Sequence, residues 1–384
     1  MNMKKNKIVV LLMALLLASC NNINNNSQNE NSIIIKDLIN REISINPGSY
    51  KRVVCIGAGA LRLYSYIGDI NLLCGVEDID NESLSNRPKM FDSVARPYFI
   101  AYKDVFKTLP SCGVGGPNNQ FAEAEKILSC NPDIIISEYE DAAKEDALQK
   151  QLGVPVITLR YGSKGVFDEN LSKSLTLLGK IFNKEDRATS LNNFILKEKN
   201  DISTRVKNVN EESKKNVYIC GLGNWGTTNE LMTSSNYEPF NVANIKNVLS
   251  DIKQEGNFKI EKEKFVSIGD DIDIMFIDAA AVKNIKPEYS LDNTMFSFVK
   301  AFNNDEVYLQ MAYNAYYTNV ELALANTWFN AICVYPTLFN DINIVDKLNE
   351  ITNEFLNMEL KDEIYSYANS FNGYQKIDVN TFFN

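Results

Sequence analysis

The stretch NKEDRATSLNNFILKEKNDISTRVKN, residues 183–208, decides the fold. Apolar side chains recur in it at offsets of 0, 3, 7, 14 and 18 positions, a helical spacing, in Ala188, Leu191, Ile195, Ile202 and Val206. At about 1.5 Å per residue this helix would be about 38 Å long, roughly the width of a domain. The pattern predicts a long helix that joins two lobes, although a surface helix of a single domain has a similar pattern.

Both ends of this segment fit a helix. Asn183 is expected to cap it, and Glu185 and Asp186 place negative charge in the first turn. Asp201 and Arg205 stand one turn apart near the other end and are expected to form an ion pair. Negative charge in the first turn and the positive charge of Arg205 near the other end therefore match the helix dipole.

Short apolar runs alternate with helical segments on both sides of this helix. The predicted strands are VVCIGAGA (53–60), LLCGVED (72–78), PDIIISE (132–138) and VPVITLR (154–160) before it, and NVYICGLG (216–223), DIDIMFID (271–278) and EVYLQM (306–311) after it. The predicted helices include residues 61–67, 121–130, 318–334 and 344–356. This alternation indicates an α/β protein with two lobes, each a mostly parallel β-sheet flanked by helices, joined by one long rigid helix. The expected domains are residues 33–182, the bridging helix 183–208, and residues 209–384.

The N-terminus has the order of a secretory signal. Lys4, Lys5 and Lys7 precede an apolar run that is shorter than the roughly 20 residues of a membrane span. The sequence LASC at residues 17–20 resembles the lipobox of bacterial lipoproteins, which implies a signal peptide over residues 1–20 and a lipid on Cys20. Residues 21–32 are nearly all Asn, Gln and Ser, so they are expected to form a flexible tether.

Composition narrows the classes of function. The formal charge is −10, and removal of the three leader lysines makes it −13, which argues against a nucleic-acid partner. The chain contains no histidine, which excludes a Ser/His/Asp hydrolase, a Cys/His protease and a histidine-ligated metal site. Six cysteines follow Cys20 without a CxxC pair, so we expect no zinc site and leave one disulfide open.

Several segments together resemble the substrate-binding lipoproteins of ABC importers in which one rigid helix joins two lobes, the ferric-siderophore and cobalamin type. They are GAGALRLYSYIG (57–68) leading to GVED (75–78), RPYFIAYKDVFKTLP (96–110), EAEKILSCNPDIII (123–136), LGVPVITL (152–159) and YNAYYTNVELAL (313–324). The resemblance covers nearly all of the mature chain and is greatest for the iron-complex branch. The segment ANTWFNAICVYP after Leu324 departs from the acidic helix that is usual there.

This resemblance implies docking on a membrane permease through one glutamate on each lobe. The family pattern places the glutamate seven residues before the Pro-Asp that opens a strand. It falls on Glu125 in the first lobe and, with Asp270 in place of the proline, on Glu263 in the second. Both residues could equally be solvated helix carboxylates.

The resemblance also places the ligand in a cleft between the lobes. Arg62 is expected in the first turn of a helix and reaching into the cleft, and Arg96, Tyr98 and Tyr102 are expected on a long loop. The complete set of expected ligand-binding residues is Arg62, Arg96, Tyr98, Tyr102, Arg160, Tyr161, Trp225, Tyr237, Tyr313, Asn314, Tyr316 and Tyr317. Thr318 to Glu321 read as a capping box that opens the following helix.

Arginine and tyrosine suit a ferric siderophore or similar iron chelate, because guanidinium groups bind its charge and aromatic rings its organic shell. Bare ferric ion held by tyrosines with Glu77 and Asp78, haem, or a corrinoid remain alternatives. We expect no resident cofactor and no metal site. A surface-anchored enzyme or an adhesin is the rival class, but the chain has no histidine and no GxSxG motif, so no enzymatic activity is expected.

The expected protein is therefore a monomeric capture protein. It would be lipid-anchored to the cell membrane, facing the periplasm or the cell exterior. Its partners would be the chelate, an ABC permease and the ATPase of that permease. The helix should limit the lobes to a small hinge or twist.

Overall fold

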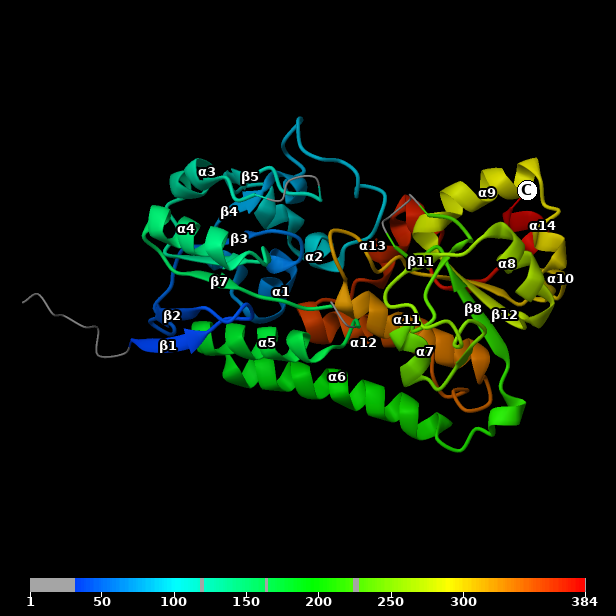
Figure 1. Ribbon diagram of the computed structural model, residues 1–384. Coiled ribbons are helices and arrows are strands. Elements are labelled where there is room, and N and C mark those ends of the chain that lie inside the picture. The colour runs from blue at the N-terminus through cyan, green and yellow to red at the C-terminus, as the bar shows by residue number, and fades with distance from the viewer. Residues whose placement is uncertain (1–31, 118–120, 163–164, 224–227, 384) are drawn as a thin grey trace, which may run out of the picture. The chain divides into compact units, whose positions relative to one another are not determined.

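The computed structural model describes residues 32–117, 121–162, 165–223 and 228–383 (Figure 1). Ile33–Asn384 form one compact unit, and this unit contains two lobes, each built on its own five-stranded sheet. The predicted α/β class with two lobes and a long helix between them is confirmed.

The first lobe has a parallel sheet with the strand order β5-β4-β3-β6-β7. Its strands are β3 (Val53–Ile56), β4 (Leu73–Glu77), β5 (Ser111–Gly113), β6 (Ile134–Ser137) and β7 (Val156–Thr158). Its helices are α1 (Ala60–Ile67), α2 (Pro97–Phe106), α3 (Ala124–Ser129), α4 (Ala142–Leu152) and α5 (Glu169–Phe182). An antiparallel hairpin of β1 (Ile33–Lys36) and β2 (Glu42–Ile45) precedes the sheet. The strands are apolar and nearly all buried, as expected of a sheet covered on both faces.

The second lobe has the strand order β10-β8-β12-β13-β14, in which only β14 is antiparallel to its neighbour. Its strands are β8 (Asn216–Cys220), β10 (Lys246–Asn247), β12 (Ile274–Asp278), β13 (Val307–Gln310) and β14 (Gln375–Lys376), with a small separate pair of β9 (Met232–Thr233) and β11 (Phe258–Lys259). Its helices are α7 (Glu238–Val242), α8 (Lys262–Ile268), α9 (Val282–Leu291), α10 (Lys300–Asn303), α11 (Val320–Val334), α12 (Ile344–Leu356), α13 (Lys361–Ser366) and α14 (Val379–Phe382).

The bridging helix is α6 (Glu185–Val206), which runs from beside α5 to the second lobe (Figure 1). All five residues of the predicted apolar stripe are buried, and Arg205 Nε donates to Asp201 Oδ1 at 2.9 Å. The predicted cap is wrong. Asn183 ends α5 in a left-handed conformation, φ 52°, and α6 begins after Lys184 without a side-chain cap. Asparagine tolerates this conformation at a helix C-terminus, so the residue closes one helix instead of opening the next.

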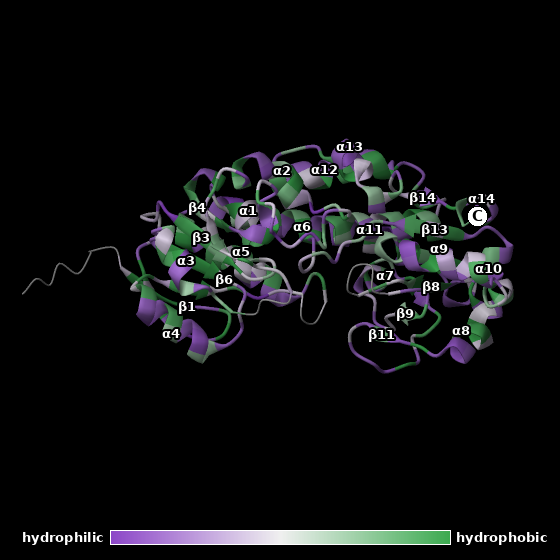
Figure 2. Ribbon diagram, turned by 90° about the horizontal axis from the view of Figure 1, so that it is seen from above, coloured by the Kyte–Doolittle hydropathy of each residue, from purple (hydrophilic) through white to green (hydrophobic). Residues whose placement is uncertain are grey.

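Two helices of the second lobe reinforce the bridge. Both α11 and α12 pack against α6, and α12 also packs against α1 and α2 of the first lobe. Figure 2 shows α6 and α11 between the strands of the two lobes. The fully buried Trp328 of α11 donates its indole N–H to Glu198 of α6 at 2.9 Å, and Lys347 of α12 donates to the same carboxylate at 3.0 Å. The three helices are therefore tied by a buried polar network as well as by apolar packing.

The cysteines after Cys20 are free thiols. Cys55, Cys74, Cys112, Cys130 and Cys220 are buried, and Cys333 is half-buried. Cys20 itself, the predicted signal peptide and all but the last residue of the tether lie outside the described residues. Within the part of the chain that the structure describes, no helix combines the length and apolar character needed to cross a membrane.

Candidate ligand-binding site

A pocket of about 490 Å³ has walls from both lobes, and we call it the interlobe pocket. Gly162, Gly165 and Val166, which follow β7 of the first lobe, form one side. The other side comes from the second lobe and includes Ser234, Asn236, Tyr237, Glu238, Glu255, Asn257, Tyr313, Asn314, Tyr317 and Thr318. The wall segments after β7 and β13 follow the carboxyl ends of parallel strands, where ligands gather in open α/β sheets.

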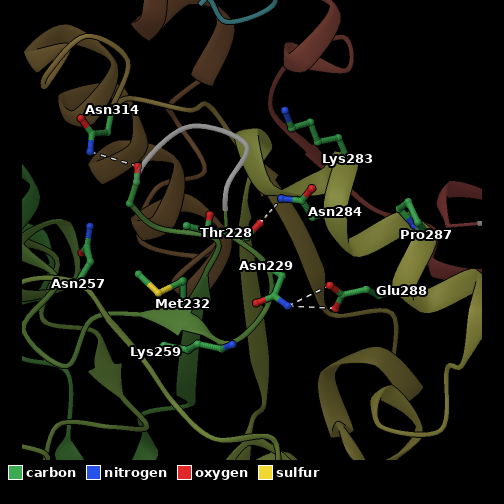
Figure 3. A pocket seen from close by; sticks show the side chains of 11 residues that line it. Thr228, Asn229, Met232, Asn257, Lys259, Lys283, Asn284, Pro287, Glu288 and Asn314 are labelled. Atoms are coloured by element: carbon green, nitrogen blue, oxygen red, sulfur yellow. Dashed lines mark hydrogen bonds between the residues drawn. The ribbon is translucent and has the colours of Figure 1, made fainter. Parts of the chain in front are cut away.

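A second pocket, of about 790 Å³, lies in the second lobe (Figure 3) and is called the lysine pocket here. Its lining includes Gly223 and Thr228 after β8, Lys259 of β11, Lys283, Asn284 and Glu288 of α9, and Asn314 after β13. Asn257 and Asn314 line both pockets. The two pockets therefore adjoin and together form a candidate cleft.

Polar side chains in the lysine pocket fix its walls. Asn314 Nδ2 donates to the carbonyl of Gly223 at 3.2 Å, and Asn284 Nδ2 donates to the carbonyl of Thr228 at 2.7 Å (Figure 3). These bonds tie the segments after β13 and β12 to the segment after β8. The wall is thus held by three strand ends of one sheet.

Residues 313–319 form a tight loop between β13 and α11, called the interlobe loop here. Asn314 and Thr318 pair as an antiparallel bridge, and the amide of Asn319 donates to the carbonyl of Tyr313 at 2.7 Å. Tyr316 and Tyr317 both have positive φ, 51° and 69°, which is unfavourable for residues with a large side chain. Such a conformation needs support from its surroundings, and the first lobe supplies it.

Arg62 of α1 supplies much of that support. Its guanidinium is fully buried and donates to Asn319 Oδ1 at 3.1 Å, to the carbonyl of Ala315 at 2.8 Å and to Tyr161 Oη at 2.7 Å. It also lies over the ring of Tyr98 at 4.7 Å. The structure places Arg62 in the first turn of a helix as predicted, but it faces the interlobe loop and lines neither pocket. Its donors hold the two lobes together.

Glu77 at the end of β4 makes a second contact with this loop. Tyr316 Oη donates to Glu77 Oε2 at 2.5 Å and accepts from the amide of Gly116 at 3.1 Å, while Glu77 Oε1 accepts from the amide of Gly57 at 3.0 Å. Burial raises the pKa of Glu77 to about 7, although its hydrogen bonds with Tyr316 and Gly57 oppose the rise. The contact between the lobes therefore contains a carboxyl group that titrates near neutral pH.

The predicted capping box at the start of α11 is wrong. Asn319 is the N-cap, but its side chain makes no capping hydrogen bond. Its Oδ1 accepts from Arg62 instead, and its Nδ2 donates to the carbonyl of Tyr313. Glu321 is fully buried and accepts from Tyr66 Oη of the first lobe. Contacts between the lobes thus replace the local capping interactions.

Arg96, Tyr98 and Tyr102 belong to helix α2 or its N-cap, so the predicted long loop is wrong for these residues. Arg96 forms a buried ion pair with Asp80, whose carboxylate also accepts from Tyr98 Oη at 2.9 Å. Tyr102 Oη donates to the carbonyl of Leu356 in the second lobe at 2.9 Å. Pro97 at the first helical position explains why the helix starts here.

The structure brings together only part of the predicted set. Tyr237, Tyr313, Asn314 and Tyr317 line the interlobe pocket. Arg62, Arg96, Tyr98, Tyr102, Tyr161 and Tyr316 are buried or half-buried in contacts within or between the lobes, and Arg160 pairs with Glu140 at 3.0 Å. Trp225 lies outside the described residues.

Sequence reasoning missed the lysines and carboxylates of the two pockets, Lys259, Lys283, Glu238 and Glu255. The sequence could have indicated Lys283 as a pocket residue, because it comes shortly after the carboxyl end of the predicted strand at residues 271–278. We find no such signal for Lys259, because β11 has only two residues.

Glu125 and Glu263 occupy matched places in the two lobes. Glu125 is exposed in the first turn of α3, which precedes β6, and Glu263 is exposed in the first turn of α8, which precedes β12. Both glutamates are therefore accessible to a partner. Among the described residues, no group of three or more Cys, Asp and Glu is arranged to hold a metal ion.

Two lobes, two mainly parallel sheets, a bridging helix and a pocket with walls from both lobes define the helical-backbone class of solute-binding proteins. Residues 101–312, more than half of the chain, match the family model described as "Periplasmic binding protein". The chain belongs to this family, whose members bind solutes outside the cytoplasm. No curated protein matches the sequence.

Solved structures share the fold at low sequence identity. A periplasmic solute binding protein from Veillonella parvula DSM 2008 matches with a TM-score of 0.67 and 20% identity over 88% of this chain and 97% of its own. Haemophilus influenzae MolA, bound to molybdate, matches with a TM-score of 0.63 and 14% identity over 85% and 98%. The catecholate-siderophore binding protein VctP from Vibrio cholerae matches with a TM-score of 0.53 and 16% identity over 77% and 99%.

Proposed function

We propose that this protein is the solute-binding lipoprotein of an ABC importer and captures a ferric siderophore or a similar iron chelate. One observation carries the proposal: a pocket of about 490 Å³ is walled by both lobes and adjoins one of about 790 Å³. Both volumes fall within the range of about 300–1,000 Å³ for small-molecule sites. MolA and VctP, which share the fold, bind molybdate and a catecholate siderophore, respectively.

The chemistry of the cleft favours a complete chelate over bare ferric ion. Burial raises the pKa of Tyr313, and it raises the pKa of Tyr317 to about 12. Both side chains are therefore neutral phenols at physiological pH, suited to donate hydrogen bonds and to stack on an organic shell. Lys259 and Lys283 add positive charge for the oxygen donors of a chelate.

Ligand titration of the purified protein tests this function. An absorbance spectrum of the protein as purified shows any coloured guest. Quenching of the fluorescence of Trp225 and Trp328 is then followed with ferric citrate, a ferric tris-catecholate, haem, cobalamin and free ferric ion. Saturable quenching by a ferric chelate at micromolar or lower concentration supports the proposal. Binding of haem, cobalamin or the free ion without binding of a ferric chelate would identify that compound as the ligand instead. Binding of none of them would overturn the capture of an iron compound.

Docking on the permease would use Glu125 and Glu263, which are exposed at matched helix starts. The double variant Glu125→Ala/Glu263→Ala is expected to bind the chelate normally but to stop uptake. The matched control removes two other exposed glutamates, Glu185 and Glu359. Normal transport by the first variant, or equal loss in both variants, would remove the docking role.

The lipid on Cys20 would hold the protein on the outer face of the cell membrane. Cys20→Ala is expected to move the protein from the membrane fraction to the soluble fraction without changing its affinity for the chelate. A variant that stays with the membrane would contradict lipid anchoring. The protein would act as a monomer and need no resident cofactor.

A further inference from the structure

The lysine pocket is cationic. Neither Lys259 nor Lys283 has an ion-pair partner among the described residues, and both are exposed. The single carboxylate of its described lining, Glu288, is already engaged, because both of its oxygens accept from Asn229 Nδ2 at 3.1 Å (Figure 3). The amide of Asn229 is neutral and leaves the charge of Glu288 in place, so two lysines against one carboxylate give the described lining a net positive charge.

The interlobe pocket has the opposite character. Two carboxylates, Glu238 and Glu255, line it, and no lysine or arginine is among its described lining residues. Glu238 accepts from the amide of Phe167 at 2.8 Å and from Lys199 at 3.4 Å, so its charge is partly balanced. Glu255 is exposed and has no partner in the part of the chain that the structure describes. The described lining of this pocket, which does not include residues 163–164, therefore offers negative charge and phenol hydroxyls.

Two neutral amides, Asn257 and Asn314, line both pockets and mark the boundary between them. An amide side chain both donates and accepts hydrogen bonds, so it serves either half of a guest. The described lining of the cleft is thus polarised along its length, with lysines in one part, carboxylates in the other and amides between them.

We propose that the cleft selects a guest whose charge is divided in the same way. Its deprotonated oxygen donors, carboxylate or catecholate, lie in the lysine pocket. Its other end carries an ammonium group and lies in the interlobe pocket near Glu255. The proposal rests on the proposed capture of a chelate and narrows the class of chelate to a bipolar one.

Opposed charges discriminate between guests because a wrongly placed charge is both repelled and left without a partner. A chelate that is anionic throughout gains from Lys259 and Lys283 but meets Glu255 with its other end. A bipolar chelate satisfies both parts. Since these side chains are exposed, each contact is worth a modest amount and weakens with added salt.

A pair of synthetic chelates tests the proposal. One is a ferric tris-catecholate with a single aminopropyl arm, and the other is the same compound with the amine acetylated. Both are titrated by fluorescence quenching at a fixed, low ionic strength into the unaltered protein, Glu255→Gln and Lys259→Ala/Lys283→Ala. The unaltered protein is expected to bind the amine-bearing chelate about tenfold more tightly, a difference of about 1.4 kcal/mol.

The variants separate the two parts of the cleft. Glu255→Gln is expected to reduce the preference for the amine to about threefold or less, and Lys259→Ala/Lys283→Ala to weaken both chelates about tenfold while keeping the preference. Glu261→Gln and Lys253→Ala/Lys264→Ala, which remove exposed charges outside both pockets, serve as controls and should match the unaltered protein.

Equal binding of the two chelates, or unchanged binding by the pocket variants, would overturn the division of charge and leave the capture of a chelate intact. Failure of both chelates and of ferric citrate to bind would overturn both proposals.

Discussion

Two cationic residues of the first lobe, Arg62 and Arg96, differ in their contacts from two of the second lobe, Lys259 and Lys283. In the first lobe, Arg62 and Arg96 are at most 2% exposed, and their guanidinium groups are bonded to protein atoms. In the second lobe, Lys259 and Lys283 are exposed at a pocket and lack ion-pair partners among the described residues. The arginines hold the fold together, and the lysines are available to a guest. Positive charge near a cleft therefore does not by itself identify a ligand contact.

The difference follows from the chemistry of the two side chains. A guanidinium has five donors in a fixed plane, so one arginine can bond the carbonyl of Ala315, the amide oxygen of Asn319 and the hydroxyl of Tyr161 together. A lysine ammonium is a strongly hydrated point charge that remains in water when no such set of acceptors surrounds it. The variants below test which side chains stabilise the contact between the lobes and which are available to a ligand.

Replacement of Arg62 should have the largest effect on stability. Arg62→Met keeps much of the side-chain volume but leaves acceptors on both lobes without donors, and it removes support from the strained loop. We expect the free energy of unfolding to fall by about 3–5 kcal/mol. Guanidinium chloride denaturation measures it, with Lys283→Ala as the matched loss of one positive charge. Equal stability of the two variants would show that Arg62 contributes no more to the stability of the fold than Lys283 does.

The contact between Glu77 and Tyr316 should make stability depend on pH. The folded pKa of Glu77, about 7, lies above its ordinary value of 4.5, so the folded protein keeps a proton that the unfolded chain releases between these values. The free energy of unfolding therefore falls as pH rises through this window, by up to about 3 kcal/mol. Glu77→Gln cannot ionise and should lack this decline.

The pH dependence is measured as the difference in unfolding free energy between the unaltered protein and Glu77→Gln at several values from pH 4.5 to 8. The difference removes the contributions of other groups, including the nearby Asp78 and Asp80. The unaltered protein should lose stability relative to the variant as pH rises. A constant difference would show that Glu77 has an ordinary pKa, and an opposite trend would show that its ionised form is the stabilising one.

A smaller effect is expected from Tyr316→Phe. The change removes the hydroxyl between Glu77 and the amide of Gly116 but keeps the ring, so it should cost about 1–3 kcal/mol. Tyr317→Phe is the matched control, because Tyr317 has a similar backbone conformation but faces the interlobe pocket. A double-mutant cycle with Glu77→Gln isolates the contact between the lobes. Additive effects would mean that the two side chains are not coupled.

Local patterns predicted the elements well because periodicity reports burial. The stripe from Ala188 to Val206 and all seven predicted strands are present, and the limits of α12 agree with the prediction. Of the residues predicted to bind the ligand, Tyr313, Asn314 and Tyr317 line the interlobe pocket, because they follow β13 and ligands gather at the carboxyl ends of parallel strands. Their role in binding stays a prediction.

The rest depended on contacts that sequence spacing does not show. Arg62 and Asn319 are 257 positions apart, and the loop before Asn319 holds Tyr316 and Tyr317 at positive φ values, which favour glycine rather than tyrosine. The hydrogen bond with Arg62 occupies the side chain of Asn319, which is the N-cap of α11 in place of the predicted Thr318 and makes no capping hydrogen bond. Lys259 reaches the pocket through the short pairing of β11 with β9. Such sites are fixed by tertiary packing, which overrides local preference.

The smallest effect on stability is expected for Lys259→Ala/Lys283→Ala, and this small value is itself informative. Both side chains are exposed and make no ion pair among the described residues, so their loss should change the free energy of unfolding by no more than about 0.5 kcal/mol. Denaturation at the pH of the ligand titrations measures it. A loss of 2 kcal/mol or more would place the lysines with Arg62, as part of the structure. A change near zero with weakened chelate binding would assign the two lysines to ligand binding. A side chain that interacts only with the bound ligand contributes to affinity and not to the stability of the free protein.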